Sequence, residues 1–289
     1  MSEPGTALVV PSGSGLGEAG RPEVVVVPVQ VVIGERSFQD GVEITPEELF
    51  GLLETSASAP TTSTPSPGEY LEAIERASQE GRDVLVLTPD SALTGMHASA
   101  LIAARLHQDE GGRGRVEVVD TRTAAGGLGM VVRVALEACR EGAPLDSVRE
   151  RVLAALPEVR MLGALSTLKH LARSGRVPSV ATGAADLLGV HPVFELHQGR
   201  IRRLGLALGA DGAVRALTRH ARRRFRSPVW LVTFHTSEPE LAAQLHERLR
   251  EALAPARSEI CRLEPSIGAH TGPGLVGFAA VPIKSGQAA

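Results

Sequence analysis

The sequence predicts an α/β protein with two domains, a Rossmann-like domain built on a parallel sheet followed by a second α/β domain. Its 289 residues suffice for two sizeable cores. The first half alternates short apolar runs with helical patterns, as βα units of a parallel sheet do. After residue 157 that alternation gives way to paired strands and longer helices. We therefore expect an N-terminal domain of residues 1–157 and a C-terminal domain of residues 158–289.

The N-terminal domain is expected to place two hydroxyl-rich loops at one edge of its sheet. The apolar run at residues 24–33 predicts one strand. The patterns that follow predict, in order, a helix at 70–79, a strand at 84–87, a helix from Met96, a strand at 116–120 and a helix at 130–140. In parallel sheets, ligands bind outside the carboxyl ends of the strands. The loops at residues 61–64 and 91–95 are therefore expected to face one crevice.

The C-terminal domain has a different order of elements. A helical segment at residues 144–156 leads into it, and residues 190–208 predict two strands around a turn at Gln198 and Gly199. The elements expected after this hairpin are helices at about 211–226 and 238–254, and strands at 229–235, 258–264 and 275–283.

The composition is that of an ordinary soluble globular protein, with 43% hydrophobic and 22% charged residues. A net charge of −3 gives no overall field that would recruit nucleic acid or an anionic membrane. The apolar run at residues 24–33 is far shorter than the roughly 20 residues needed to span a bilayer. The chain starts without a secretory leader, so we expect a cytoplasmic protein with no integral membrane segment.

Metal and nucleotide sites find little support. The two cysteines and nine histidines lack zinc-ligand spacing. Two G-x-G-x-x-G matches, at residues 15–20 and 272–277, are not followed by the helix on whose N-terminus a pyrophosphate would sit. The arginine run at residues 219–226 most simply predicts a solvated helix face, with docking of an acidic partner or of nucleic acid as alternatives. We expect no cofactor.

Four consecutive hydroxyl residues lie in the segment APTTSTPSPGEY, residues 59–70. Ser66, followed by a proline and then by Glu69, predicts the N-cap of a helix with a capping box. The hydroxyls at residues 61–64 have no such local role. Pro60 and Pro65 favour an extended backbone there, beside the positive end of the helix dipole. That position suits an anion.

His270 is a second candidate binding residue. It lies in the glycine-rich stretch SIGAHTGPG, expected to be a loop where exposed backbone and Thr271 approach a small ligand. His191, His197 and His220 are more simply strand or surface residues. Because aromatic residues make up only 3% of the chain, its interior must be filled mainly by aliphatic side chains. Such an interior is compatible with a narrow slot for a flexible hydrocarbon.

Four segments, taken in order, resemble motifs of the DegV family, whose members include FakB, the fatty-acid-binding subunits of bacterial fatty acid kinase. PTTSTPSP resembles the family's Pro-Thr-Thr-Ser-Gln-Pro-Ser-Pro, and SALTGMHASA resembles Ser-x-Leu-Ser-Gly-Thr with Thr94 at the serine. LKHLARSGRV is similar to Leu-x-x-Leu-Lys-Lys-Gly-Gly-Arg-Ile, and IGAHTGPGLVGFA to the closing His-Thr-Gly-Pro-Gly loop. The resemblance extends over residues 24–281.

This resemblance implies a non-catalytic protein that buries the chain of a long-chain fatty acid and holds its carboxylate in the crevice between the domains. The hydroxyls of Thr62 and Thr94 and the N–H of Gly95 would hydrogen-bond the carboxylate. His270 would contact or orient it, and Arg176 would belong to the surrounding polar network. A separate ATP-binding fatty acid kinase would phosphorylate the carboxylate. The residues of the implied site are Thr62, Ser63, Thr94, Gly95, His270, Thr271 and Arg176.

Departures from the family pattern leave alternatives open. Only Ser12 remains of the usual Thr-Asp-Ser after the first strand, and His191 stands where lysine is common. Lipid binding without any kinase is therefore one alternative. The rival from another class is an acyl hydrolase or transferase with Thr94 or Ser63 as nucleophile and His270 as base. No acidic residue in the sequence can be nominated to orient that base, and no DNA-binding motif supports a role in gene control.

Overall fold

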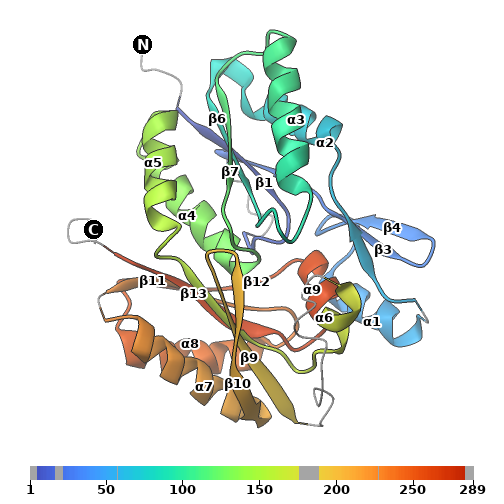
Figure 1. Cartoon of the computed structure of the whole chain (residues 1–289), viewed down its shortest axis with the longest axis vertical. Coiled ribbons are helices and arrows are strands. Elements are labelled where there is room, and N and C mark those ends of the chain that lie inside the picture. The colour runs from blue at the N-terminus through green and yellow to red at the C-terminus, as the bar shows by residue number, and fades with distance from the viewer. Residues whose placement is uncertain (1–4, 17–21, 57, 176–188, 227, 284–289) are drawn as a thin grey trace.

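The computed structural model describes residues 5–16, 22–56, 58–175, 189–226 and 228–283. Helices and strands are interspersed along these residues, whose strands form three sheets (Figure 1). The predicted α/β class is confirmed. Within the described residues, no helix combines the length and the apolar character needed to cross a membrane.

The first sheet is parallel, as predicted, and lies in the N-terminal half. Its strands, in spatial order, are β2 (Val24–Val27), β1 (Ala7–Pro11), β6 (Val84–Thr88) and β7 (Val116–Asp120). Strands β1 and β6 are buried along their whole length because helices cover both faces of the sheet. One face packs on α2 (Pro67–Ala77) and α3 (Met96–Asp109), and the other on α4 (Gly126–Arg140) and α5 (Leu145–Ala155).

The second sheet has six strands and is antiparallel apart from one pair. In spatial order its strands are β10 (Arg200–Leu208), β9 (Val190–His197), β8 (Arg160–Ala164), β13 (Val276–Pro282), β11 (Val229–His235) and β12 (Arg257–Arg262). Only β11 and β12 pair in parallel. Helices α7 (Gly209–Arg224) and α8 (Pro239–Leu253) cover one face. The opposite face packs on α4.

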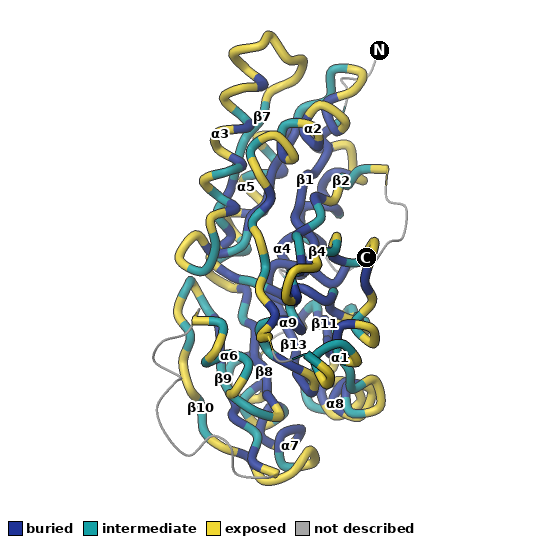
Figure 2. The backbone as a smooth tube through the Cα atoms, turned by 90° about the vertical axis from the view of Figure 1, so that its right-hand side faces the viewer, coloured by how far each residue is buried: buried dark blue, intermediate teal, exposed yellow. Residues whose placement is uncertain are grey.

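Helix α4 therefore lies between the two large sheets and belongs to the core of both. Twelve of its fifteen residues are buried, which is typical of a helix enclosed on all sides. Figure 2 shows this buried layer along the strands and α4, with exposed residues on the outer helices. We propose that the domain boundary predicted at residue 157 falls where the chain leaves α5 and enters β8.

The apolar run at residues 24–33, predicted as one strand, is two strands in two different sheets. Strand β2 ends at Val27, and β3 (Gln30–Ile33) pairs antiparallel with β4 (Arg36–Gln39) and β5 (Thr61–Ser63). The break falls at Pro28, which has no N–H to donate to a ladder. The N–H of Val29 donates instead to Ser12 Oγ at 3.0 Å. Helix α1 (Pro46–Thr55) lies between β4 and β5 in the chain.

Two segments expected to be loops are regular structure. Thr61–Ser63 form β5, an edge strand rather than a free loop. His270 lies on the short helix α9 (Pro265–Thr271), where a loop was predicted. Pro265 occupies the first helical position, and Gly272 ends the helix with a positive φ of 75°. The remaining short helices are α6 (Lys169–Ser174) and the 3₁₀ turn η1 (Gln79–Gly81).

Candidate functional site

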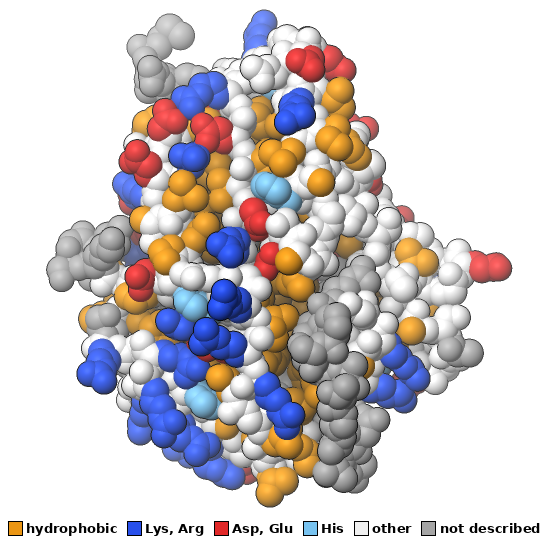
Figure 3. Space-filling model, viewed as in Figure 1, with side chains coloured by type: hydrophobic (Ala, Val, Ile, Leu, Met, Phe, Trp, Pro, Cys, Tyr) orange, Lys and Arg blue, Asp and Glu red, His pale blue; other side chains and the backbone are white. Residues whose placement is uncertain are grey.

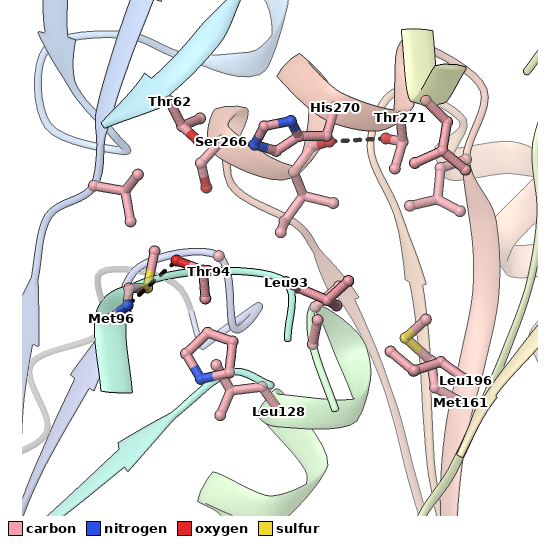
Figure 4. A pocket seen from close by; sticks show the side chains of 18 of the residues that line it. Thr62, Leu93, Thr94, Met96, Leu128, Met161, Leu196, Ser266, His270 and Thr271 are labelled. Atoms are coloured by element: carbon pink, nitrogen blue, oxygen red, sulfur yellow. Dashed lines mark hydrogen bonds between the residues drawn. The ribbon is translucent and has the colours of Figure 1, made fainter. Parts of the chain in front are cut away.

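A cavity of about 410 Å³ opens at the carboxyl ends of the parallel strands. The small sheet and α9 border one side of it, and β8 and β9 border the other. Its lining is divided by polarity: Thr62, Ser266 and Thr94 surround one end, while Met161 and Leu196 lie at the opposite side (Figure 4). The cavity therefore has a hydroxyl-rich end and an aliphatic end.

Thr62 and His270 meet at the polar end. Thr62 lies on β5 opposite Val31, and its side chain faces the cavity while those of its neighbours Thr61 and Ser63 are exposed. Thr62 Oγ1 is 2.8 Å from His270 Nε2. Helix α9 begins at Pro265, beside the cavity. Its second turn therefore places the His270 side chain against Thr62.

The loop before α3 supplies the second group of donors. Met96 N donates to Thr94 Oγ1 over 3.4 Å, and Thr64 Oγ1 lies 3.4 Å from the same oxygen. Gly95 is the N-cap of α3, so the N–H groups around it have no acceptor within the helix and carry the positive end of its dipole. The prediction that the two hydroxyl-rich segments face one crevice is confirmed.

Two described residues of the sequence-predicted site, Ser63 and Thr271, are placed differently from the rest. Ser63 is exposed on the outer face of β5 and does not line the cavity. Thr271 lines it, but its hydroxyl donates to the carbonyl of Ile267 at 2.9 Å within its own helix. Arg176 lies outside the described residues.

Three further hydroxyls line the polar end, those of Ser12, Thr64 and Ser266. The site implied by the resemblance did not include them, although the run at residues 61–64 was predicted to suit an anion and Ser12 matches a serine of the family pattern. Ser12 comes directly after β1, so the rule for carboxyl ends of parallel strands could have identified it. Thr64 belongs to the hydroxyl run itself. Ser266 precedes His270 by one turn of α9, so the two side chains share a face of the helix, a relationship that a loop would not have.

The aliphatic end is formed by elements from both halves of the chain. Leu128 comes from the first turns of α4, and Met161 and Leu196 face each other across the β8–β9 ladder. Phe194 of β9 and Ile201 of β10 extend this surface. These side chains offer no hydrogen bonds, so this part of the cavity suits a hydrocarbon.

The described cavity lining contains no Asp, Glu, Lys or Arg side chain. The described residues also hold no cluster of three or more His, Cys, Asp or Glu side chains suited to a metal ion. Hydroxyls and a helix N-terminus can hold an anion by donating hydrogen bonds without forming an ion pair. Chemically, this end of the cavity is suited to a carboxylate or another small anion.

Most of the arginine run lies on α7, which ends at Arg224. Arg219, Arg222 and Arg223 are exposed and border a groove beside α8, and basic side chains gather over α7 in Figure 3. Arg224 turns inward, and its Nε lies 2.6 Å from Glu195 Oε1. Burial alone would raise the pKa of Glu195, but the guanidinium groups of Arg224 and Arg160 hold it below its usual value. The run is thus mainly a solvated face with one structural ion pair.

A protein-family model for uncharacterised proteins of the DegV family matches residues 6–283. A DegV domain-containing protein of Streptomyces coelicolor is 34% identical over 262 residues, which cover 88% of this chain and 89% of that protein. The structure of a fatty-acid-binding DegV family protein from Thermus thermophilus is similar with a TM-score of 0.86 and 31% identity, covering 96% of this chain and 100% of the other.

The fatty acid kinase B3 protein of Streptococcus pneumoniae, loaded with linoleic acid, has a similar structure with a TM-score of 0.87 and 21% identity. The match covers 97% of this chain and all of that protein. At this identity the likeness concerns the fold.

Proposed function

Because this chain belongs to the DegV family, we propose that it binds one long-chain fatty acid, with the acyl chain in the aliphatic part of the cavity and the carboxylate at its hydroxyl-rich end. The observation that carries this proposal is the division of one cavity into an end lined by hydroxyls and an end lined by aliphatic side chains. The fatty-acid-binding relative from Thermus thermophilus supports the same ligand class.

The acyl chain would provide most of the affinity. Burying about 14 methylenes at roughly 0.8 kcal/mol each stabilises the complex by on the order of 11 kcal/mol before the costs of ordering and association. The carboxylate head group then needs only protein donors that replace its hydrogen bonds to water. Thr62, Thr94 and the N–H of Gly95 are the donors that we assign to the carboxylate, with His270 orienting Thr62.

We further propose that the protein is a non-catalytic carrier in the cytoplasm that presents the carboxylate to a separate ATP-dependent fatty acid kinase. The support is the fold shared with the pneumococcal fatty acid kinase B3 protein. Neutral donors suit this role, because a bidentate arginine clamp would stabilise the carboxylate charge and make the oxygen a weaker nucleophile toward a phosphoryl group. Binding of fatty acid without a kinase is the simpler alternative.

One observation favours an acyl hydrolase as a second candidate. The 2.8 Å contact between Thr62 Oγ1 and His270 Nε2 has the spacing of a nucleophile and its base. The nucleophiles expected from the sequence were Thr94 and Ser63, but it is Thr62 that contacts His270. The hydrolase reading therefore predicts that Thr62, rather than Thr94 or Ser63, is the nucleophile.

Two assays on delipidated protein separate these functions. Palmitate binding is measured by isothermal titration calorimetry, and release of p-nitrophenol from p-nitrophenyl palmitate is measured in parallel. A carrier binds one palmitate and releases no more than one p-nitrophenol per chain. Multiple turnovers that disappear in His270→Ala would establish the hydrolase. Kinase coupling is tested separately, by trapping acyl phosphate with hydroxylamine after adding ATP and a bacterial fatty acid kinase catalytic subunit.

A further inference from the structure

Asp40 is a buried carboxyl group directly behind the polar end of the cavity. It lies between β4 and α1, its residue is 2% exposed, and it does not line the cavity itself. Its Oδ1 accepts a hydrogen bond of 2.7 Å from the N–H of Ser266, in the first turn of α9. Its Oδ2 is buried and has no hydrogen-bond partner within the described residues.

Two cavity-lining hydroxyls flank this carboxyl group, those of Ser12 and Ser266. Gly13, next to Ser12, lies close against α9: a Cβ added at Gly13 would be only 3.1 Å from Ser266 Oγ. Burial raises the pKa of Asp40, whereas hydrogen bonding with the Ser12 and Ser266 hydroxyls and with the Ser266 N–H lowers it. Hydrogen bonds place both serines beside Asp40: Ser266 donates its N–H to Asp40 Oδ1, and Val29 donates its N–H to Ser12 Oγ while its carbonyl accepts the N–H of Asp40 at 2.8 Å. Both serine side chains also line the cavity.

Each serine hydroxyl has a single proton to give. Ser12 Oγ already accepts the N–H of Val29 at 3.0 Å, so its remaining choice is the direction of its own O–H. An ionised carboxylate accepts hydrogen bonds and donates none. While Asp40 is ionised, it competes with a ligand carboxylate for the protons of Ser12 and Ser266.

We propose that Asp40 is a positioning residue that turns the Ser12 and Ser266 hydroxyls away from the ligand, so that the carboxylate is held by the donors on β5 and at the start of α3. This inference rests on the proposed binding of a fatty acid. Its consequence is a head-group site weaker than the hydroxyls lining it would allow, because an ionised Asp40 attracts the protons of Ser12 and Ser266 and its charge repels an anion.

A purely structural role for Asp40 predicts something different. In that case its carboxyl group only fixes the first turn of α9, and through it His270. Asp40→Asn separates the two roles, because the amide oxygen still accepts the Ser266 N–H while the amide nitrogen donates to a serine oxygen. The variant keeps the bond to α9, removes the negative charge, and releases a serine hydroxyl proton toward the cavity.

The test measures dissociation constants of palmitate and of hexadecanol for delipidated wild type, Asp40→Asn and Asp40→Ala. We expect Asp40→Asn to bind palmitate about tenfold more tightly, the size of one added charge-assisted hydrogen bond, with hexadecanol affinity unchanged. Asp40→Ala, which loses the bond to α9, should weaken both ligands. Adding Ser266→Ala to Asp40→Asn should reverse the gain for palmitate. Glu43→Gln, an exposed carboxylate on the same loop, is the matched control and should change neither affinity.

An unchanged ratio of palmitate to hexadecanol affinity in Asp40→Asn would overturn the inference and leave only the structural role. Asp40→Ser, which removes the charge with a shorter side chain, provides a second neutral variant if asparagine disturbs the fold, and it should likewise raise the ratio of palmitate to hexadecanol affinity. Failure of the proposed function looks different: wild type would then bind neither palmitate nor hexadecanol.

Discussion

Thr62 Oγ1 lies 2.8 Å from His270 Nε2, although 208 positions separate the two residues in the sequence. The contact joins the small N-terminal sheet to α9, so the polar end of the cavity exists only when both halves of the chain are packed together. If Nε2 carries the ring proton, it donates to Thr62 Oγ1 and leaves the threonine proton free for a ligand. His270 can in this way set the direction of the Thr62 hydroxyl.

Replacing Thr62 with valine removes this hydroxyl while keeping the shape of the side chain. We expect palmitate to bind about 10- to 100-fold more weakly, because a hydrogen bond to a charged group contributes about 1.5–3 kcal/mol. Ser63→Ala is the matched control on the same strand, facing outward, and should change the affinity less than about twofold. Calorimetric titration of both variants provides the comparison. Equal losses in the two variants would contradict the assignment.

Filling the aliphatic end should shorten the preferred ligand. Leu196 is 3% exposed and faces the cavity, so Leu196→Trp occupies space that we assign to the acyl chain. Palmitate should lose affinity, since each methylene excluded from the cavity costs about 0.8 kcal/mol, while decanoate is retained better. Leu206→Trp on the neighbouring strand β10, where the leucine is 48% exposed, is the control. Competition between fatty acids of different length measures the shift, and an unchanged order would argue against this end as the chain site.

The ion pair beneath the arginine run should make stability depend on pH. Arg224→Met leaves the nearly buried Glu195 with Arg160 alone, and we expect a loss of about 2 kcal/mol in the free energy of unfolding at pH 7. The folded-state pKa of Glu195 is lowered from 4.5, so the pair stabilises the fold above that pH and its contribution is lost as the pH falls through the folded-state pKa. Urea unfolding of wild type and variant should therefore converge in acid. A difference that is the same at pH 7 and in acid would contradict this account.

Asp40 should give the opposite dependence. Its pKa is raised from 3.8 in the folded state, so the folded protein binds this proton more strongly than the unfolded chain does. Wild type consequently loses stability as the pH rises above 3.8, until Asp40 is fully ionised in the folded state. Asp40→Asn lacks this loss. The stability of the variant relative to wild type should increase with pH and then level off, as measured by urea unfolding between pH 4 and pH 8, with Glu43→Gln as control.

Features governed by local chemistry were predictable from the sequence. Ser66 and Glu69 form the expected capping box, with Glu69 N donating to Ser66 Oγ at 3.3 Å. The alternation of apolar strands and helices gave the parallel sheet, because a strand buried on both faces is apolar throughout its length. The meeting of the Thr62 and Thr94 segments followed from the shared edge at which parallel strands end.

Features set by tertiary packing were not predictable in the same way. An apolar run contains no sign that its two halves belong to different sheets, apart from the missing donor at Pro28. The glycines near His270 suggested a loop because a helix as short as α9 has little periodicity to detect. Ser63 faces away from the cavity because successive side chains of β5 point to opposite faces. A loop, which the sequence predicted here, would impose no such alternation. The role proposed for Asp40 depends on its contact with Ser266, which is 226 positions away in the sequence and has no local sequence signal.

The central claim is that this cavity holds a fatty acid, and lipid mass spectrometry tests it most directly. The mass of the purified native protein is measured first. The protein is then denatured, and the lipid released from it is extracted and identified. We expect close to one long-chain fatty acid per chain, with a native mass larger by that amount, and depletion of the lipid in Thr62→Val but not in Ser63→Ala. A lipid-free protein that also fails to take up added palmitate would contradict the claim.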